Sequence, residues 1–285
     1  MSELRDAVRA ATRTLADAGV GSPEHDAVAL AAHALGVDAG EVRRRMILGG
    51  PVPTSYAGLV AERAARVPLQ HLTGRAWFRG LELEVGPGVF VPRPETEVVA
   101  SWAIEAAQAC VDDGIAAPVV VDLCTGSGAI ALSLKAEVPQ AQVHAVEVSD
   151  LAVAWAMRNR DRLGLDVEIV HADAVTALGD LDDVDVVVSN PPYIPTTAEP
   201  VDPEVRDHDP HVALYGGSED GLAIPRLVAA RAAGLLRSGG VLVMEHADSQ
   251  GESLPAALRA SGSWRLVEDR PDLTGRPRAA VAIRA

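Results

Sequence analysis

Four consecutive residues, Asn190-Pro191-Pro192-Tyr193, have the types and spacing to do chemistry on a nitrogen atom. The two prolines fix the backbone and carry no N–H, which leaves carbonyl groups to point into a cleft. The side-chain oxygen of Asn190 and a proline carbonyl can both accept from one NH₂ group, and Tyr193 can stack on the planar group that carries it. Such a site turns the nitrogen lone pair of an amide or aromatic amine toward a methyl sulfonium, and positioning supplies the catalysis. We predict that all four residues are catalytic; the alternative is an ordinary Pro-Pro turn.

A second segment, Asp122-Leu123-Cys124-Thr125-Gly126-Ser127-Gly128, follows a run of valines and could cradle a ligand. Small residues let the backbone approach a ligand closely, and the helix that follows would point its N-terminus there. A tight strand-to-helix turn would use similar residues. The segment lacks the third glycine of a dinucleotide site and the Lys-Ser/Thr of a P-loop. We predict that its cofactor-binding residues are Asp122, Cys124, Thr125, Gly126, Ser127 and Gly128, joined by Asn190.

Two acidic residues further along could complete the cofactor site. Glu147 ends an apolar run about twenty residues after the glycine-rich turn, where an acid can accept from ribose hydroxyls. Asp173, beside Ala174, follows the next apolar run and could accept from an adenine amine. The alternatives are a solvated acid for Glu147 and a helix N-cap for Asp173. We predict that Glu147, Asp173 and Ala174 bind the cofactor.

Strands that alternate with helices must position these residues. Apolar runs predict strands at 119–121, 143–148, 167–170, 184–188, 241–244, 264–269 and 279–284, with helices at 129–136, 150–163, 220–236 and 251–261. This alternation predicts an α/β fold with a mostly parallel sheet covered on both faces. The last two strands have no helix between them and must form an antiparallel hairpin. The stretch 190–218 reads as irregular. Ligands of such sheets bind at the carboxyl ends of the strands, where all the predicted site residues lie.

The first part of the chain has a different pattern. Helical periodicity predicts helices at 3–18, 22–35, after Asp38 and at 55–66, without a strand. Apolar runs at 77–78, 81–85 and 89–91, separated by glycines, predict a β-hairpin, and a helix follows at 95–108. We therefore predict three segments: a helical domain at 1–70, a hairpin linker at 71–97 and an α/β domain at 98–285.

Charge and composition exclude several classes of function. The net charge is −15, and the part after residue 75 holds sixteen basic and thirty-two acidic residues. Nucleic-acid binders need a basic surface, so no nucleic-acid partner is expected. The two cysteines, Cys110 and Cys124, have no metal-ligand spacing, and no metal is expected. The chain shows no signal peptide and no apolar run of membrane-spanning length. We expect a cytoplasmic monomer without a membrane partner.

Several segments together resemble the class I S-adenosylmethionine-dependent methyltransferases. More closely, the chain is similar to the family that methylates the glutamine of the Gly-Gly-Gln motif in class 1 peptide chain release factors. The similarity extends over nearly the whole chain. The segments that carry it are 68–74, 91–97, 122–128, 190–195, 213–217, 220–222 and 272–276, together with Glu147.

The resemblance implies a Rossmann-like domain of seven strands that binds S-adenosylmethionine. It also implies that the helical N-terminal domain docks the protein substrate, and that a glutamine carboxamide is presented to Asn190. The chain departs from the family pattern at a few positions. Glu147 replaces an aspartate, Ala174 replaces an aromatic residue, 206–210 replaces Phe-Glu-Pro, and Ala247 replaces a glycine.

Three other functions remain as alternatives at this point. A glutamine methyltransferase of a ribosomal protein would use the same catalytic loop. An adenine methyltransferase of DNA or RNA shares Asn-Pro-Pro-Tyr, but the acidic surface and the lack of a basic groove for a flipped base oppose it. A non-catalytic adaptor is disfavoured because the cofactor segment and the catalytic segment are both intact.

Overall fold

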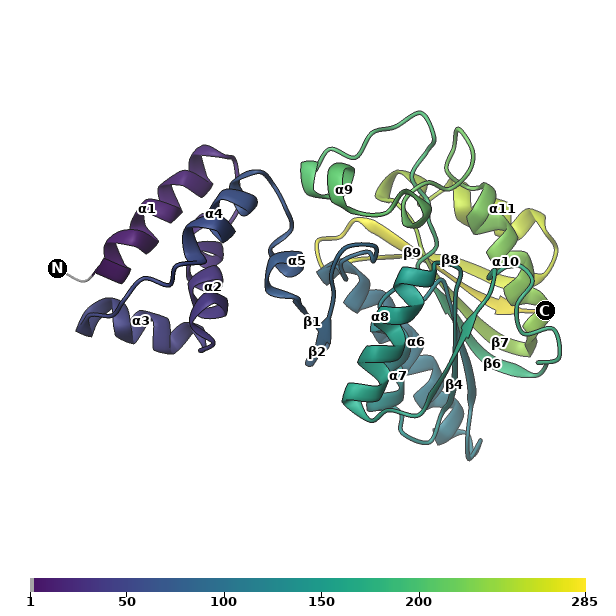
Figure 1. The fold of residues 1–285 in the computed structure, drawn as a ribbon. Coiled ribbons are helices and arrows are strands. Elements are labelled where there is room, and N and C mark those ends of the chain that lie inside the picture. Colours follow the sequence, from purple (N-terminus) through teal and green to yellow (C-terminus); the bar gives the residue numbers. More distant parts are fainter. Residues whose placement is uncertain (1–2) are drawn as a thin grey trace. The chain divides into compact units, whose positions relative to one another are not determined.

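The computed structural model describes residues 3–285 of the chain. Its contacts divide the chain into two compact units (Figure 1). Unit 1 contains the residues up to Arg75 together with 85–87 and 201–208, and unit 2 contains 76–84, 88–200 and 209–285. This division differs from the three predicted segments in two respects. Most of the hairpin belongs to unit 2, and a short segment from the second half of the chain belongs to unit 1.

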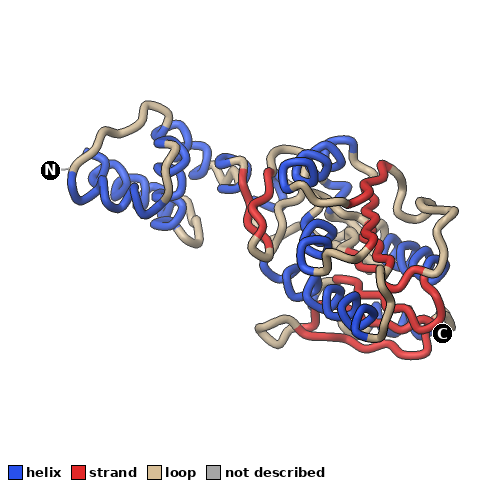
Figure 2. Tube along the Cα trace, turned by 90° about the horizontal axis from the view of Figure 1, so that it is seen from below, coloured by secondary structure: helices blue, strands red, loops and turns tan. Residues whose placement is uncertain are grey.

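Unit 1 consists of helices and loops (Figure 2). The helices are α1 (Glu3–Asp17), α2 (Pro23–Leu35), α3 (Ala39–Leu48), α4 (Tyr56–Ala64) and α5 (Leu69–Thr73). The first four confirm the predicted helices to within a few residues. Asp38 caps α3 by accepting from the amide of Glu41 at 2.8 Å. The fifth was not predicted, because Pro68 reads as a helix breaker, whereas it precedes the first turn of α5, where a missing N–H costs nothing.

The segment 201–208 of unit 1 contains the helix α9 (Pro203–His208), in a stretch that was predicted to be irregular. Its Glu204 accepts from the buried guanidinium of Arg63 at 2.7 Å and from Arg66 at 3.0 Å. Arg63 also donates to the buried carboxylate of Asp26 at 2.8 Å. Buried charges persist in a folded chain only when paired, so this network fixes α9 on α4.

Unit 2 is built on a seven-stranded sheet with the order β5-β4-β3-β6-β7-β9-β8. The strands are β3 (Val119–Leu123), β4 (Gln142–Glu147), β5 (Val167–His171), β6 (Val184–Ser189), β7 (Leu236–Glu245), β8 (Trp264–Pro271) and β9 (Pro277–Arg284). All pairs are parallel except β7–β9 and β8–β9, so the predicted sheet with a terminal antiparallel hairpin is confirmed. β7 begins earlier than predicted, because Gly239 and Gly240 are part of the strand.

A separate two-stranded hairpin of β1 (Arg75–Phe78) and β2 (Leu81–Glu84) precedes this sheet, as predicted. The expected strand at 89–91 is wrong, because these residues form a loop. Gly88 has a φ of +91°, and Pro92 removes a donor, so the chain between them cannot join a ladder. The apolar side chains of Val89 and Val91 are nevertheless buried.

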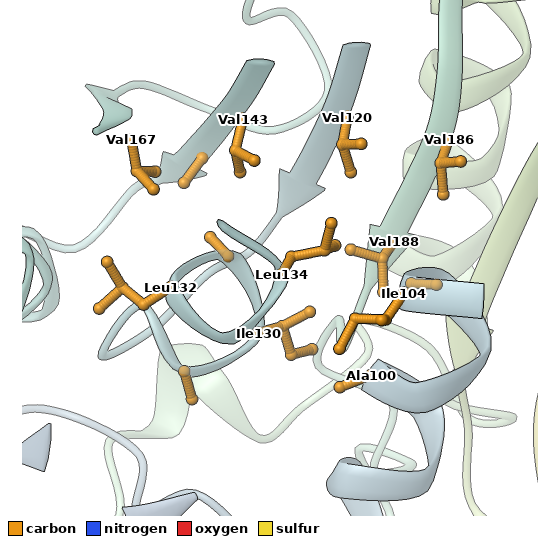
Figure 3. Close-up of a cluster of buried hydrophobic side chains, with 14 of the residues drawn as sticks. Ala100, Ile104, Val120, Ile130, Leu132, Leu134, Val143, Val167, Val186 and Val188 are labelled. Carbon is orange, nitrogen blue, oxygen red and sulfur yellow. The ribbon is translucent and has the colours of Figure 1, made fainter. Parts of the chain in front are cut away.

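Helices cover both faces of the sheet. One face packs against α6 (Pro94–Asp112), α7 (Ala129–Glu137) and α8 (Asp150–Leu163), and the other against α10 (Ala223–Leu235) and α11 (Ser253–Ala260). Neighbouring strand residues alternate between the two cores: Val120 and Val186 face the first, and Val121 and Val187 face the second. Figure 3 shows the first core, where Val120, Val143 and Val167 lie over α7, and Val186 and Val188 lie over Ile104 of α6.

The register of the parallel strands brings their carboxyl ends to the same edge. Leu123 pairs with Val146 on one side and with Ser189 on the other, and Ser189 pairs with Met244. The segments that follow β3, β4, β6 and β7 therefore emerge side by side. The strand order reverses between β3 and β6, which is where open α/β sheets bind ligands. No helix among residues 3–285 is long and apolar enough to cross a membrane.

Candidate active site

The glycine-rich loop after β3 is held from inside by Asp122. The carboxylate of Asp122 is fully buried, and its Oδ2 accepts from Thr125 Oγ1 at 2.6 Å and from the amide of Ala131 at 3.1 Å. Burial raises the pKa of Asp122 to about 7, while the hydrogen bond from Thr125 opposes this shift. These contacts tie the loop to the first turn of α7. The structure therefore favours a role for Asp122 in shaping the loop.

Positive φ angles let the loop turn sharply. Cys124, Gly126 and Gly128 have φ values of +68°, +59° and +85°. A Cβ on Gly126 would meet nothing within 4 Å, so this side of the loop is open to an approaching ligand. A Cβ on Gly128 would lie 3.0 Å from Leu132, so this glycine permits close packing on α7. Burial raises the pKa of the Cys124 thiol above its usual range, which makes it an uncharged wall of the site.

Glu147, at the end of β4, is fixed by backbone donors. Its Oε2 accepts from the amide of Gly126 at 2.8 Å, and its Oε1 accepts from the amides of Val148 and Ser149 at 2.9 Å each. A carboxylate has about four acceptor positions, so these three bonds leave capacity for a ligand hydroxyl. The bond to Gly126 joins the predicted ribose acid to the glycine-rich loop. The solvated-acid alternative is wrong, because Glu147 is only 8% exposed.

Asp173 and Ala174 lie in the turn after β5, two and three residues beyond the end of this strand, which pairs with β4. The side chain of Asp173 accepts from the amide of Val175 at 2.9 Å, but no helix begins at 174, so the N-cap interpretation is wrong. Asp173 is exposed and Ala174 is buried. Their roles in cofactor binding stay predictions.

The residues around the loop suit S-adenosylmethionine. The open space over Gly126 admits a small ligand, and Glu147 offers the acceptors that a ribose diol needs. The acidic side chain of Glu147, bonded to the amide of Gly126 in the loop, favours a ligand that carries a sulfonium cation. The donor set and the charge therefore match this cofactor.

Asn190, directly after β6, has an oriented side chain. Its Nδ2 donates to the hydroxyl of the buried Thr96 in α6 at 3.3 Å. Its Oδ1 accepts no hydrogen bond from the described residues, and the same holds for the carbonyl oxygens of Pro191 and Pro192. The loop therefore presents several acceptors together, as a substrate NH₂ group requires.

Tyr193 is fixed at both ends. Its hydroxyl donates to Oε1 of Glu245, the last residue of β7, at 3.2 Å, and its carbonyl accepts from Gln250 Nε2 at 2.9 Å. Glu245 is buried, which raises its pKa to about 7, while a hydrogen bond from Thr96 and the charge of Arg278 oppose the shift. Burial and the charge of Glu245 raise the pKa of Tyr193 above its usual range, so Tyr193 stays a neutral donor.

The glycines of the segment after the catalytic loop permit very close backbone approach. A Cβ on Gly221 would lie 2.1 Å from the carbonyl oxygen of Tyr193, and a Cβ on Gly216 would lie 1.8 Å from the carbonyl oxygen of Gly221. The amide of Ile194 donates to Leu214, and that of Gly216 donates to Ile194. Only glycine fits these two positions, so the segment holds the catalytic loop from behind.

Two of the departures from the family pattern are accommodated by the structure. Asp209 keeps an acid where the family has Phe-Glu-Pro, and it pairs with Arg93 at 2.8 Å. Ala247 replaces a glycine but has a φ of −65°, which any residue adopts, and its amide donates to Gln250 Oε1 at 3.0 Å.

Sequence reasoning missed three residues of the site: Thr96, Glu245 and Gln250. Thr96 lay in a recognised segment but was given no role. Glu245 follows the apolar run Val241–Met244, and a polar residue at the end of an apolar strand is the same signal that identified Glu147. No sequence pattern indicates Gln250, because its partners come from two other loops.

Two family models match the chain. One described as "PrmC N-terminal domain" matches residues 6–74, and one described as "Methyltransferase small domain" matches residues 108–202. A solved methyltransferase from Pyrococcus furiosus aligns with a TM-score of 0.53 at 20% identity, covering 79% of this chain and 98% of that one. At this identity the likeness confirms the methyltransferase fold.

Full-length relatives give a closer match. The chain is 53% identical over 287 residues to the "Release factor glutamine methyltransferase" of Streptomyces coelicolor, covering 100% of this chain and 99% of the relative. It is 42% identical over 271 residues to the "4-amino-L-phenylalanine/4-methylamino-L-phenylalanine methyltransferase" of Streptomyces pristinaespiralis, covering 94% and 91%. With more than half of its residues shared over the whole length of the first relative, the chain belongs to the S-adenosylmethionine-dependent release factor glutamine methyltransferase family.

Proposed function

We propose that this protein transfers a methyl group from S-adenosylmethionine to the side-chain amide nitrogen of the glutamine in the Gly-Gly-Gln motif of class 1 peptide chain release factors. The observation that carries the proposal is the orientation of Asn190. Its Nδ2 is bonded to Thr96, so Oδ1 faces away from Thr96 as an acceptor. A carboxamide has two N–H donors in one plane, and they match Oδ1 of Asn190 and a carbonyl of Pro191 or Pro192.

Asn190 and the loop carbonyls would act mainly by positioning. Two hydrogen bonds in the amide plane fix that plane and leave its face, where the nitrogen lone pair lies, toward the glycine-rich loop. When bound, S-adenosylmethionine supplies an electrophilic methyl group. As the substrate nitrogen takes the methyl group, the methyl–sulfur bond would break and leave S-adenosylhomocysteine. Positive charge would develop on the nitrogen, stabilised by the oxygens of Asn190 and the loop, until the nitrogen loses one of its two protons to solvent. Tyr193 offers its ring as a flat wall for the substrate amide.

The cofactor would be held by the loop 122–128 and the acids that follow β4 and β5. Glu147 would accept from the ribose hydroxyls, with its orientation set by the amide of Gly126. Asp173 would accept from the adenine amine, and Ala174 would line the adenine pocket. Asp122 would act by holding the loop, since its carboxylate bonds to Thr125 and Ala131.

The helical segment 1–70 would dock the protein substrate. The segment 71–97 would join this domain to the methyltransferase domain at 98–285, which would carry out the reaction. The match of residues 6–74 to a family-specific N-terminal domain supports this division. Removal of residues 1–70 should therefore raise KM for an intact release factor much more than it raises Kd for S-adenosylhomocysteine. Unchanged methylation of the intact factor by the truncated chain would contradict the docking role.

A second candidate substrate is a free aromatic amino acid that carries an arylamine. The relative from Streptomyces pristinaespiralis, named for such substrates, is 42% identical over nearly the whole chain. An arylamine is also a planar NH₂ group, so Asn190 and the loop carbonyls would accept it in the same way. The catalytic loop cannot separate the two substrates.

The deciding experiment offers both substrates to the purified protein. The protein is incubated with a class 1 release factor, with 4-aminophenylalanine or, for comparison, with ribosomal proteins. Each mixture contains methyl-labelled cofactor, and the products are identified by mass spectrometry. Methylation on the Gly-Gly-Gln glutamine, lost in Asn190→Ala although S-adenosylhomocysteine still binds, is the expected result. Methylation of 4-aminophenylalanine alone would replace the first proposal by the second, and methylation of a ribosomal protein alone would overturn both.

The proposed substrate also leads to expectations about the binding partners of this protein and its location in the cell. Release factors act on ribosomes in the cytoplasm, and the protein would act there as a monomer. The net charge of −15 supports the expectation that it binds neither DNA nor RNA by itself. Light scattering and a titration with labelled RNA test these two points.

A further inference from the structure

The Asn190 side chain contacts a group of buried polar residues behind the catalytic loop. Its Nδ2 donates to Thr96 Oγ1 at 3.3 Å. Thr96 also acts on the carboxylate of Glu245, whose pKa its hydroxyl lowers as a donor. Tyr193 also donates to this carboxylate, at 3.2 Å. Both ends of the catalytic tetrapeptide therefore depend on one buried acid.

The direction of these bonds follows from the chemistry of the groups. An ionised carboxylate can only accept, so Tyr193 donates to Glu245, and a hydrogen bond between Thr96 and Glu245 must be donated by Thr96. A hydroxyl has a single proton. When Thr96 donates this proton in a hydrogen bond to Glu245, the Thr96 oxygen can only accept a hydrogen bond from Asn190. The amide of Asn190 must then turn Nδ2 toward Thr96 and Oδ1 toward the substrate. A protonated Glu245 would lift this constraint, since it could donate to Thr96 and let Asn190 adopt the opposite orientation.

We propose that Glu245 and Thr96 are positioning residues that set the orientation of the Asn190 amide and thereby decide whether the site accepts a substrate NH₂ group. The proposal rests on the proposed function only in that it needs a substrate with a planar NH₂ group, which both candidate substrates have.

The surroundings of Glu245 show that the acid is not there for stability alone. It is 2% exposed, and its Oε2 has no hydrogen-bond partner among the described residues. A buried and incompletely paired carboxylate is costly, and an apolar residue would serve the core better. Four groups act on its pKa: Thr96, Tyr193 of the catalytic loop and Arg278 of β9 lower it, and Glu95 of α6 raises it. The positive charge of Arg278 opposes the effect of burial on the pKa of Glu245, and Asp272 pairs with Arg278 at 3.2 Å.

The protonation state of Glu245 should make turnover depend on pH. Burial raises the pKa of Glu245 to about 7. The acid is ionised above this pH, which is the state that fixes Asn190, and it becomes protonated below it. Turnover should therefore decrease as the pH falls through about 7. Asp122 also has its pKa raised to about 7, so an acidic limb by itself does not identify Glu245.

The experiment compares Glu245→Gln, Thr96→Val and Thr96→Ser with the wild-type protein, using Glu105→Gln on the exposed face of α6 as the control. We expect Glu245→Gln and Thr96→Val to lower kcat/KM by about 10- to 100-fold. Thr96→Ser keeps the hydroxyl and should restore most of the activity. Glu245→Gln should also remove the acidic limb of the pH profile, whereas Glu105→Gln should leave rate and profile unchanged.

Two further measurements do not depend on turnover. Titration with S-adenosylhomocysteine should give the wild-type Kd for every variant, which shows that each is folded. In the wild type, the infrared band of protonated carboxyl groups should increase as the pH is lowered through about 7. The part of this increase that comes from Glu245 should be absent in Glu245→Gln.

A retained acidic limb in Glu245→Gln, or a Thr96→Ser variant as inactive as Thr96→Val, would overturn the proposal. If the wild type methylates only the arylamine substrate, the proposed function is wrong. The ratio of kcat/KM between each variant and the wild type, measured on the arylamine, would then still test the roles of Glu245 and Thr96.

Discussion

The side chain of Gln250 joins the catalytic loop to the segment after β7, since its Nε2 donates to the carbonyl oxygen of Tyr193 at 2.9 Å. The same nitrogen donates to the carbonyl of Asp220 at 2.9 Å, and Oε1 accepts from the amide of Ala247 at 3.0 Å. Gln250 is buried, so these bonds are shielded from water. One side chain thus fixes three loops at the carboxyl edge of the sheet.

Replacement of Gln250 by alanine should loosen the catalytic loop. Two carbonyls would lose their buried donor, at a cost of about 1–3 kcal/mol for each unsatisfied group. We expect a lower free energy of unfolding and a kcat/KM reduced about tenfold or more, because Tyr193 shifts. Urea denaturation and steady-state kinetics measure the two effects. Gln108→Ala, which removes an exposed hydrogen bond to Asp112, is the control and should change neither.

Gly221→Ala should displace the Tyr193 carbonyl by steric overlap. The new Cβ would lie 2.1 Å from that oxygen, and the residue has a φ of +71°. Gly262 has the same φ of +71° with nothing within 4 Å of its Cβ position, so Gly262→Ala reports the backbone strain alone, about 1–2 kcal/mol. Thermal denaturation and kinetics should show a larger loss of stability in Gly221→Ala and a loss of activity in that variant only. Equal effects in both would mean that the close approach is unimportant.

The stability of the protein should decrease as the pH rises from about 4 to about 7. Burial raises the pKa of Asp122 from 3.8 to about 7, so in this range the folded chain binds a proton that the unfolded chain has lost. The unfolding free energy therefore falls with pH across the window. Glu245, whose pKa is raised to about 7, acts in the same direction.

Asp122→Asn tests this expectation, since it keeps the acceptor for Thr125 and cannot ionise. Denaturant titrations at pH 5 and pH 7.5 should show a smaller difference in unfolding free energy for Asp122→Asn than for the wild type. The double variant with Glu245→Gln should flatten the dependence further. An unchanged pH slope in the double variant would contradict the assignment.

Arg63→Met should destabilise unit 1. The substitution leaves the carboxylate of Asp26 buried without its partner, whereas Glu204 keeps its bond to Arg66 at 3.0 Å. Removing one member of a buried ion pair costs about 3–5 kcal/mol. Arg44→Met breaks an exposed pair with Glu41, which solvent screens, and should cost far less. Calorimetry compares the two, and adding Asp26→Asn to Arg63→Met should recover part of the loss.

The sequence predicted the fold and the chemistry of the site well, because both depend on local patterns. Valine-rich runs alternating with helical segments led to the seven-stranded sheet, and the glycines after β3 marked the turn. Glu147 and Asn190 could be predicted because each directly follows a buried strand, and parallel strands bring such positions to one edge. The strand expected at 89–91 was wrong because apolar residues also fill a core from a loop.

By itself, the sequence determined which residues reach the carboxyl edge of the sheet and that their chemistry suits a planar nitrogen. Only the tertiary structure decided how these residues are oriented. Thr96 lies 94 positions from Asn190 along the chain, and Tyr193 lies 52 positions from Glu245. Hydrogen bonds between side chains so far apart leave no periodic pattern, because they arise only after the two cores have brought α6, β6 and β7 together.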